Sequence, residues 1–323
     1  MCSTGVFFGE ELARYSFGKS HPWNYDRIYH FQSKIQSEHL DIDCRLKVEE
    51  PCLTDEETIL MFHNKDYVEL VKNFSRSGSG VLDMGDTPAF KGMFEASCFV
   101  IGSTLKALDI VATKKGGIEH AFNPIGGLHH ARRDSAGGFC VFNDIGIAAL
   151  VARKKYGLHR ILYVDIDAHH GDGVYYEFQD DPLFFIADIH EDGNFLYPGT
   201  GSELETGIDQ AEGTKLNIPL KPRSSDTDFI AAFHKIEEFI DNVAKFDLII
   251  FQSGADCLAD DPLAHLNYTS NAHRYSANVL HRISHEYCNG RIIALGGGGY
   301  NNINLSVAWV EVIKSFIKNP KFI

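Results

Sequence analysis

The chain has 323 residues and is 44% hydrophobic, which is enough for one large α/β domain or two ordinary ones. Its 30 lysines and arginines stand against 44 aspartates and glutamates, so the formal net charge is −14. This balance argues against direct nucleic-acid binding, because such proteins neutralise phosphates with basic side chains. It is compatible with a basic peptide or a polycation as the partner.

Seven cysteines without any Cys-x-x-Cys spacing do not suggest a disulfide framework, and they indicate a reducing compartment. Residues 1–15 lack a basic region followed by a long apolar one, so no signal peptide is expected. No apolar stretch approaches the roughly 20 residues of a membrane span. We therefore expect a cytoplasmic protein that does not associate with membranes, and the oligomeric state stays open.

From about residue 54 onward, helical and strand patterns alternate along the chain. The sequence Thr-Asp-Glu-Glu at 54–57 is a capping box ahead of a helix that runs toward Phe74. Apolar spacing predicts further helices over residues 93–112, 145–156 (with Gly157 as C-cap) and 229–243. Short apolar runs predict strands over residues 161–164, 183–186, 248–251 and 292–295. This alternation indicates a parallel sheet covered on both faces, within a single domain over residues 1–323.

The loop after the strand at 161–164 holds the densest group of metal-ligating side chains. Asp167 and His169 are two residues apart, so on an extended backbone they point to the same side. A solvated polar loop is the alternative, but loops seldom place acids against a buried apolar strand without a partner for the charge. We therefore interpret this segment as the start of a metal site.

Polar clusters also follow the strands at 248–251 and 292–295, and functional groups in such folds gather at the carboxyl ends of strands. Asp256 is a natural third ligand, although it is also a candidate helix N-cap. Two carboxylates and one imidazole suit zinc or ferrous iron, and three protein ligands leave positions open for water and substrate.

His129 and His130 form a tandem pair whose alternatives are a polar surface pair or one satisfied buried histidine. Asp165 and Asp172 are not needed as metal ligands, so each can accept an Nδ1–H and orient one imidazole as a general base requires.

The glycine run at 296–299 precedes Tyr300 and lacks the Lys-Ser/Thr of a phosphate-binding loop. Small residues here would let the Tyr300 hydroxyl approach the metal and donate to a developing oxyanion.

In this order, the motifs resemble the histone deacetylase family, in the broad sense that includes bacterial acetoin-utilisation-type proteins and acetylpolyamine amidohydrolases. The resemblance covers nearly the whole chain and includes segments 15–22 (Tyr-Ser-Phe-Gly-Lys-Ser-His-Pro) and 197–201 (Tyr-Pro-Gly-Thr-Gly). It implies an arginase/deacetylase-type α/β fold, with a mostly parallel sheet flanked by helices and the active site at the carboxyl ends of the strands.

The resemblance also implies residue roles. The zinc ligands would be Asp167, His169 and Asp256. His130, paired with Asp172, would act as general base and then general acid on a metal-activated water. His129, paired with Asp165, would be mainly electrostatic. Tyr300 would polarise the scissile carbonyl.

The family's substrate channel maps onto a second set of residues. Phe139 and Tyr197 match its aromatic walls, with Gly138 beside the first, and Asp86 resembles the rim aspartate that binds the substrate backbone. Leu263 stands where polyamine deacetylases place an acidic gatekeeper, which favours an acyl-lysine peptide or protein as the substrate.

Two further positions concern charge beneath and beside the site. Arg27 resembles an arginine of the internal channel beneath the metal. Asp188 stands where a serine often helps hold a structural potassium ion, which puts that ion's presence or geometry in doubt.

The implied activity is zinc-dependent hydrolysis of Nε-acyl-lysine, with acetyl as the preferred acyl group. An acetylpolyamine or other small acylated-amine amidohydrolase is the nearest alternative. A binuclear manganese ureohydrolase would need an acid where Gly171 stands. A binding scaffold without turnover would be expected to lack a ligand or the tyrosine.

Overall fold

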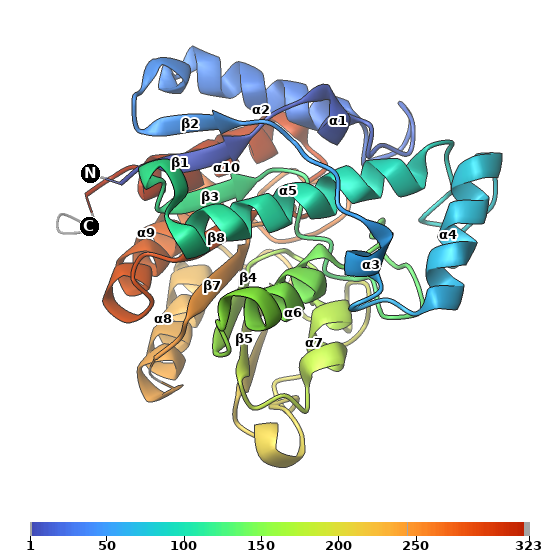
Figure 1. Ribbon diagram of the computed structural model, residues 1–323. Coiled ribbons are helices and arrows are strands. Elements are labelled where there is room, and N and C mark those ends of the chain that lie inside the picture. Colours follow the sequence, from blue (N-terminus) through green and yellow to red (C-terminus); the bar gives the residue numbers. More distant parts are fainter. Residues whose placement is uncertain (1, 244, 320–323) are drawn as a thin grey trace.

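The computed structural model describes residues 2–243 and 245–319 (Figure 1). Its strands are β1 (Thr4–Phe7), β2 (Leu46–Glu49), β3 (His120–Asn123), β4 (Ile161–Asp165), β5 (Phe184–Glu191), β6 (Lys215–Leu220), β7 (Leu248–Gln252) and β8 (Ile292–Leu295). Its α-helices are α1 (Glu10–Ala13), α2 (Asp26–Ser37), α3 (Glu56–Ile59), α4 (Lys65–Ser77), α5 (Met93–Thr113), α6 (Asp144–Tyr156), α7 (Asp172–Phe178), α8 (Asp226–Val243), α9 (Ser270–Tyr287) and α10 (Asn302–Phe316). Short 3-10 helices span Leu40–Ile42, Lys115–Gly117 and Asp209–Ala211.

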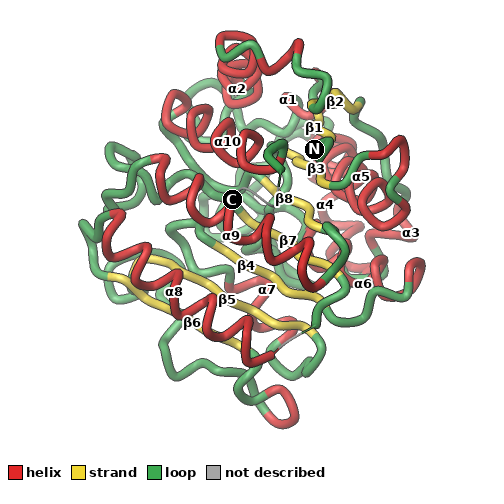
Figure 2. The backbone as a smooth tube through the Cα atoms, turned by 90° about the vertical axis from the view of Figure 1, so that its left-hand side faces the viewer, coloured by secondary structure: helices red, strands yellow, loops and turns green. Residues whose placement is uncertain are grey.

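All eight described strands belong to one sheet in the order β2-β1-β3-β8-β7-β4-β5-β6, and every pair is parallel. Parallel neighbours need crossover connections, which the helices supply. Helices α2, α8, α9 and α10 cover one face of the sheet, and α5 and α6 lie on the other (Figure 2). The predicted α/β architecture is therefore confirmed, and the described sheet is wholly rather than mostly parallel.

The four central strands decide where the polar clusters meet. Strands β3, β8, β7 and β4 are adjacent, and Asp165 at the end of β4 pairs in register with Gln252 at the end of β7. Because all four strands run the same way, the segments that follow them emerge at one edge of the sheet. The histidine pair, the glycine run, Asp256 and Asp167 all lie on those segments.

The predicted helix from the capping box to Phe74 is two helices. The N-cap of α3 is Asp55, one residue after the Thr54 of the capping box, and it accepts a hydrogen bond from the Thr58 amide at 2.8 Å. The chain then leaves the helix, because Asn64 is extended and its amide donates to the Arg133 carbonyl at 2.8 Å. This long-range contact replaces the local helical bond.

The other predicted helices and strands are present, with one large difference in length. Strand β5 begins one residue later than predicted and continues to Glu191. Its second half carries the buried polar residues Asp188, His190 and Glu191, which is why an apolar pattern did not find it. Strands β1, β2, β3 and β6 were not predicted, because polar residues or glycine interrupt each of these short runs (TGVF, LKVE, HAFN and KLNIPL).

Helix α5 is the one described helix that is long and apolar enough to cross a membrane, with a mean hydropathy of 1.4 over its most apolar stretch. About two thirds of that stretch (67%) is buried inside the protein, where α5 packs on β3 and α6. It is built as a core helix.

Gly102 in the middle of α5 is required by a close approach of the chain. A Cβ at this position would overlap the carbonyl oxygen of Cys52 and lie 2.7 Å from the carbonyl carbon of Leu53. We expect Gly102→Ala to lower the free energy of unfolding by about 1–3 kcal/mol in urea denaturation, despite alanine's better helix propensity. Thr113→Ala at the exposed end of α5 is the control, with an expected change within about 0.5 kcal/mol. Equal stability of the two variants would contradict a tight contact.

Candidate active site

Asp167, His169 and Asp256 come together at the carboxyl edge of the sheet, all three buried. Their ligating atoms lie within 4.8 Å of one another, and His169 Nδ1 is 3.0 Å from both Asp167 Oδ1 and Asp256 Oδ2. Ligands of a tetrahedral zinc ion are separated by about 3.3 Å, so the donor set fits such an ion. Asp256 accepts from the Ala168 amide at 2.8 Å and does not cap a helix among the described residues.

This group also favours positive charge. Burial raises the pKa of Asp256 to about 7, and the neighbouring charge of Asp167 adds to the effect. Burial acts to lower the pKa of His169, but its bonds to the two carboxylates outweigh this and raise the pKa well above its ordinary value. A divalent cation bonded to all three ligands would supply the charge that this position favours.

Neighbouring polar groups fix the second oxygen of Asp167. The Gln252 side-chain amide and the Gly298 backbone amide each donate to Oδ2 at 2.8 Å. A Cβ at Gly298 would overlap a carboxylate oxygen of Asp256. The glycine run therefore allows backbone to pack directly against both acids.

His129 and His130 are both buried and each is paired with the predicted acid. His129 Nδ1 lies 2.7 Å from Asp165 Oδ2, and His130 Nδ1 lies 2.7 Å from Asp172 Oδ1. A carboxylate on Nδ1 places the lone pair of a neutral imidazole on Nε2. The polar-surface interpretation of the pair is thereby excluded.

The protonation of the His130 pair is set by burial and by one arginine. Burial lowers the pKa of His130 to about 4, helped by His129 and opposed by Asp172. Burial acts to raise the pKa of Asp172, but bonds from His130 and Arg132 hold it at about 2. The Arg132 bond to Asp172 Oδ2 is 2.8 Å long, and the sequence motifs did not point to this arginine. At neutral pH the pair is thus a neutral imidazole on an ionised carboxylate.

A cavity of about 220 Å³ opens above these groups. It is lined by Asp86, His130, Gly138, Phe139, His169, Leu196, Tyr197, Leu263 and Tyr300. The structure thus brings every predicted substrate-binding residue, and Tyr300, to one cavity. Leu196 is the one lining residue that was not predicted. Burial raises the pKa of Tyr300 well above its ordinary value, with Asp256 and Asp167 adding to it, so its hydroxyl stays a donor.

Phe139 adopts a left-handed backbone, with a φ of 68°, and its neighbours hold it there. The Tyr15 hydroxyl donates to its carbonyl at 2.7 Å, and its amide donates to Thr87 Oγ1 at 3.1 Å. Gly138 is also left-handed, and a Cβ there would overlap the His130 ring. Tyr15 begins segment 15–22 and Thr87 directly follows Asp86, both of which the sequence analysis singled out. Their positioning of Phe139, however, depends on contacts between residues that are distant in the chain.

Arg27 is fully buried beneath the glycine run. Its guanidinium donates to the carbonyls of Gly297, at 2.6 Å, and of Gly299, and it stacks at 4.1 Å over the Trp23 ring. Desolvation lowers the pKa of Arg27 to about 10, so it is charged at neutral pH. The predicted cation therefore lies under the loop that carries Tyr300.

Asp188 is engaged by protein groups on both oxygens. Oδ1 lies 2.7 Å from His190 Nδ1, and Oδ2 accepts from the Gly171 amide at 2.9 Å. Burial acts to lower the pKa of His190, but Asp188 raises it above its ordinary value. The structural potassium ion stays a prediction.

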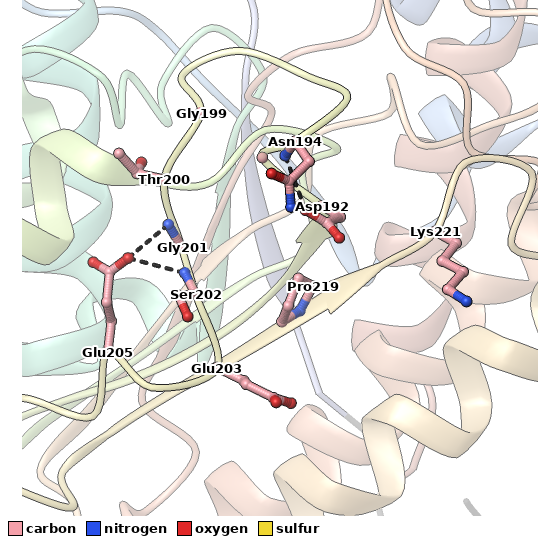
Figure 3. A pocket seen from close by; sticks show the side chains of 11 residues that line it. Asp192, Asn194, Gly199, Thr200, Gly201, Ser202, Glu203, Glu205, Pro219 and Lys221 are labelled. Carbon is pink, nitrogen blue, oxygen red and sulfur yellow. Dashed lines mark hydrogen bonds between the residues drawn. The ribbon is translucent and has the colours of Figure 1, made fainter.

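A larger cavity of about 460 Å³ is lined in part by residues 199–203, in the loop that follows Tyr197 (Figure 3). It contains none of the predicted catalytic residues. Glu205 Oε1 accepts from the amides of Gly201 and Ser202, at 3.0 and 2.9 Å, and His170 Nδ1 lies 2.8 Å from Thr200 Oγ1. These bonds fix the loop that follows Tyr197, and so they support the wall that Tyr197 forms in the smaller cavity.

Comparison with known proteins shows the family to which this chain belongs. A family model described as the histone deacetylase domain matches residues 21–316. The chain belongs to the histone deacetylase family. The acetoin utilization protein AcuC of Bacillus subtilis (strain 168) is 38% identical over 297 residues, covering 89% of this chain and 75% of that protein. AcuC of Staphylococcus aureus (strain MSSA476) is 32% identical, covering 98% and 82%.

A solved structure agrees with the sequence relatives. The crystal structure of the HDA15 HD domain superposes with a TM-score of 0.87 at 27% identity, covering 98% of this chain and 88% of that one. The predicted family and fold are confirmed. The chain is thus a member of a metal-dependent hydrolase family that acts on acetylated amides, and the individual residue roles stay predictions.

Gln252 begins the polar cluster that follows the strand predicted at 248–251, but the sequence analysis assigned it no role in the site. Gln252→Met keeps the volume but removes one of the two donors to Asp167 Oδ2, so the ligand is less firmly oriented. We expect the zinc concentration that restores half of the hydrolase activity of metal-depleted protein to rise about 10–100-fold. Gln210→Met on the surface is the control. An unchanged metal requirement would show that the amide does not orient Asp167.

Proposed function

We propose that this protein is a zinc-dependent lysine deacylase that hydrolyses Nε-acetyl-lysine in peptides or proteins. The observation that carries the proposal is that His169, one of three clustered metal-ligating side chains, lines one cavity together with the carboxylate-paired His130 and with Tyr300. A bound zinc ion would activate water and polarise the substrate carbonyl. Zinc is preferred over ferrous iron because hydrolysis needs a Lewis acid and no redox chemistry.

His130 is proposed as the proton carrier. Asp172 holds Nδ1, so Nε2 faces the cavity with a lone pair, and the low pKa keeps the imidazole neutral before attack. Nε2 then takes the proton of the attacking water and delivers it to the leaving lysine amine. His129, held by Asp165 beside it, contributes mainly through its electrostatic effect.

Tyr300 is proposed to stabilise the negative charge that develops on the carbonyl oxygen. It lines the cavity beside Phe139, with ring centroids 5.5 Å apart. A protonated hydroxyl at a fixed position in a water-poor site is a strong oxyanion donor. Its position is fixed through its backbone amide, which donates to Asp261 Oδ2 at 2.8 Å.

The cavity walls support a lysine side chain as the substrate stem. Phe139, Leu196, Tyr197 and Leu263 offer apolar surface to a four-carbon stem, and the exposed Asp86 carboxylate at the rim can accept a peptide N–H. We propose a peptide or protein partner on this basis.

The seven unpaired cysteines support the cytoplasm as the location.

The test is a panel of peptides that differ only in the acyl group on lysine, assayed beside acetylspermidine with and without a hydroxamate chelator. We expect hydroxamate-sensitive turnover that is fastest for acetyl-lysine. Faster turnover of acetylspermidine would identify an acetylpolyamine amidohydrolase instead. No turnover of any substrate by zinc-loaded protein would support a binding scaffold.

Tyr300→Phe removes only the hydroxyl of the proposed oxyanion donor. We expect kcat on the acetyl-lysine peptide to fall about 10²–10³-fold while the melting temperature stays unchanged. Tyr25→Phe, on an exposed ring at the N-terminal boundary of α2, serves as the matched control. Unchanged turnover by Tyr300→Phe would refute the role.

A further inference from the structure

A second cluster of metal-ligating side chains lies at the opposite edge of the sheet, where the strands begin. Cys2 precedes β1, His120 is the first residue of β3, and His281 and His285 are one turn apart on α9 (Figure 1). Cys2, His120 and His281 are buried and His285 is half-buried, and one ligating atom from each lies within 4.8 Å of all the others. The active-site residues play no part in this cluster.

Backbone carbonyls fix the tautomers of two of the three imidazoles. His120 Nδ1 lies 2.9 Å from the Gly290 carbonyl, and His281 Nδ1 lies 2.9 Å from the Ser315 carbonyl. A carbonyl only accepts, so each Nδ1 carries the hydrogen and each neutral ring keeps its lone pair on Nε2. Three imidazolium rings with centroids 4.6–5.1 Å apart would repel one another, so the rings are neutral.

Hydrogen bonding within the cluster leaves at least one of these lone pairs without a donor. His285 Nε2 lies 3.3 Å from His120 Nε2 and 3.4 Å from Cys2 Sγ, but it carries either one hydrogen or one lone pair. His281 is fully buried, and its Nε2 has no hydrogen-bond partner. A buried polar atom without a partner destabilises the folded state, so it needs an explanation such as an ion.

Two of the six separations between the ligating atoms match a tetrahedral zinc ion, and the other four lie within 4.8 Å. Zinc bonds of 2.0–2.1 Å to nitrogen and 2.3 Å to sulfur put two nitrogens about 3.3 Å apart, and a nitrogen and a sulfur about 3.6 Å apart. The observed values are 3.3 Å between His285 and His120 and 3.4 Å between His285 and Cys2. Carbonyl bonds to the far nitrogens of ligating histidines are also the usual way in which metal ligands are oriented.

We propose that Cys2, His120, His281 and His285 form a second, structural zinc site. Four protein ligands complete a tetrahedron and leave no open position, so this ion would hold the structure together without taking part in hydrolysis. It would tie the segment before β1 to β3 and α9, and through the Ser315 carbonyl to α10. The proposal does not depend on the proposed deacylase activity.

Cobalt(II) substitution distinguishes the two sites, because a thiolate ligand gives cobalt an intense near-ultraviolet charge-transfer band that carboxylates and imidazoles do not. We expect metal-depleted protein titrated with Co²⁺ to develop this band and to reach its full intensity by about two equivalents, one for each site. Asp256→Asn, which disrupts the other site, should keep the band. Cys2→Ser should lose it, and Cys44→Ser, at an exposed cysteine, should keep it.

Zinc content after reconstitution and gel filtration provides a second readout. We expect about two zinc ions per chain in the wild type and about one in each of Asp256→Asn and His281→Gln. His281→Gln should also lose the cobalt band while retaining the wild-type circular dichroism spectrum. The proposal is overturned if the wild type shows no charge-transfer band, if the band survives Cys2→Ser, or if His281→Gln binds as much zinc as the wild type.

Discussion

The carboxylate of Asp167 is almost wholly buried, and its charge has to be compensated by whatever surrounds it. Removing an ion from water costs several kcal/mol unless partners replace the lost hydration. Gln252, the Gly298 amide and His169 provide those partners, and they come from three separate segments at the carboxyl edge of the sheet. The glycine run, the side chain at the end of β7 and the turn after β4 therefore act together to stabilise the buried charge of Asp167.

The same constraint orders the rest of the cavity. Asp165 and Asp172 are also buried, and each is compensated by one imidazole of the tandem pair. Arg132 adds a second bond to Asp172, and Arg27 adds a buried positive charge below the glycine run. Acids and bases thus alternate through the site, which keeps His130 neutral and in one tautomer while the cavity above stays lined with apolar walls. That combination is what a water-activating hydrolase needs.

The cluster at the other edge of the sheet is a contrasting case, in which buried lone pairs rather than buried charges lack compensation. The active-site acids find hydrogen-bond donors within the protein, whereas His281 Nε2 finds none. The proposed catalytic groups lie at the carboxyl ends of the parallel strands. On our proposal, a structural metal ion lies at their amino ends, where it joins three elements: the segment before β1, strand β3 and helix α9.

The local parts of the site are readable from sequence because extended backbone is periodic. Residues two apart on an extended segment lie on the same side of it, so the spacing of Asp167 and His169 predicts that they act together. In the structure β4 ends at Asp165, and the bend that follows brings the two together, with the His169 amide donating to Asp167 Oδ1 at 3.0 Å. The same kind of local reasoning places Gly157 as a helix cap and the polar clusters at strand ends. It fails over residues 54–74, where the Asn64 amide binds the Arg133 carbonyl and breaks a locally consistent helix.

The alternation of helices and strands after residue 54 and, through the motifs, the family follow from the sequence alone. The folded structure was needed to show that Tyr15 and Thr87 fix Phe139, that Arg132 reaches Asp172, and that Cys2 meets three distant histidines. The reason is that local spacing fixes the direction of a side chain on its own element. Which elements become neighbours depends instead on the order of eight parallel strands, which is set by packing of the whole chain.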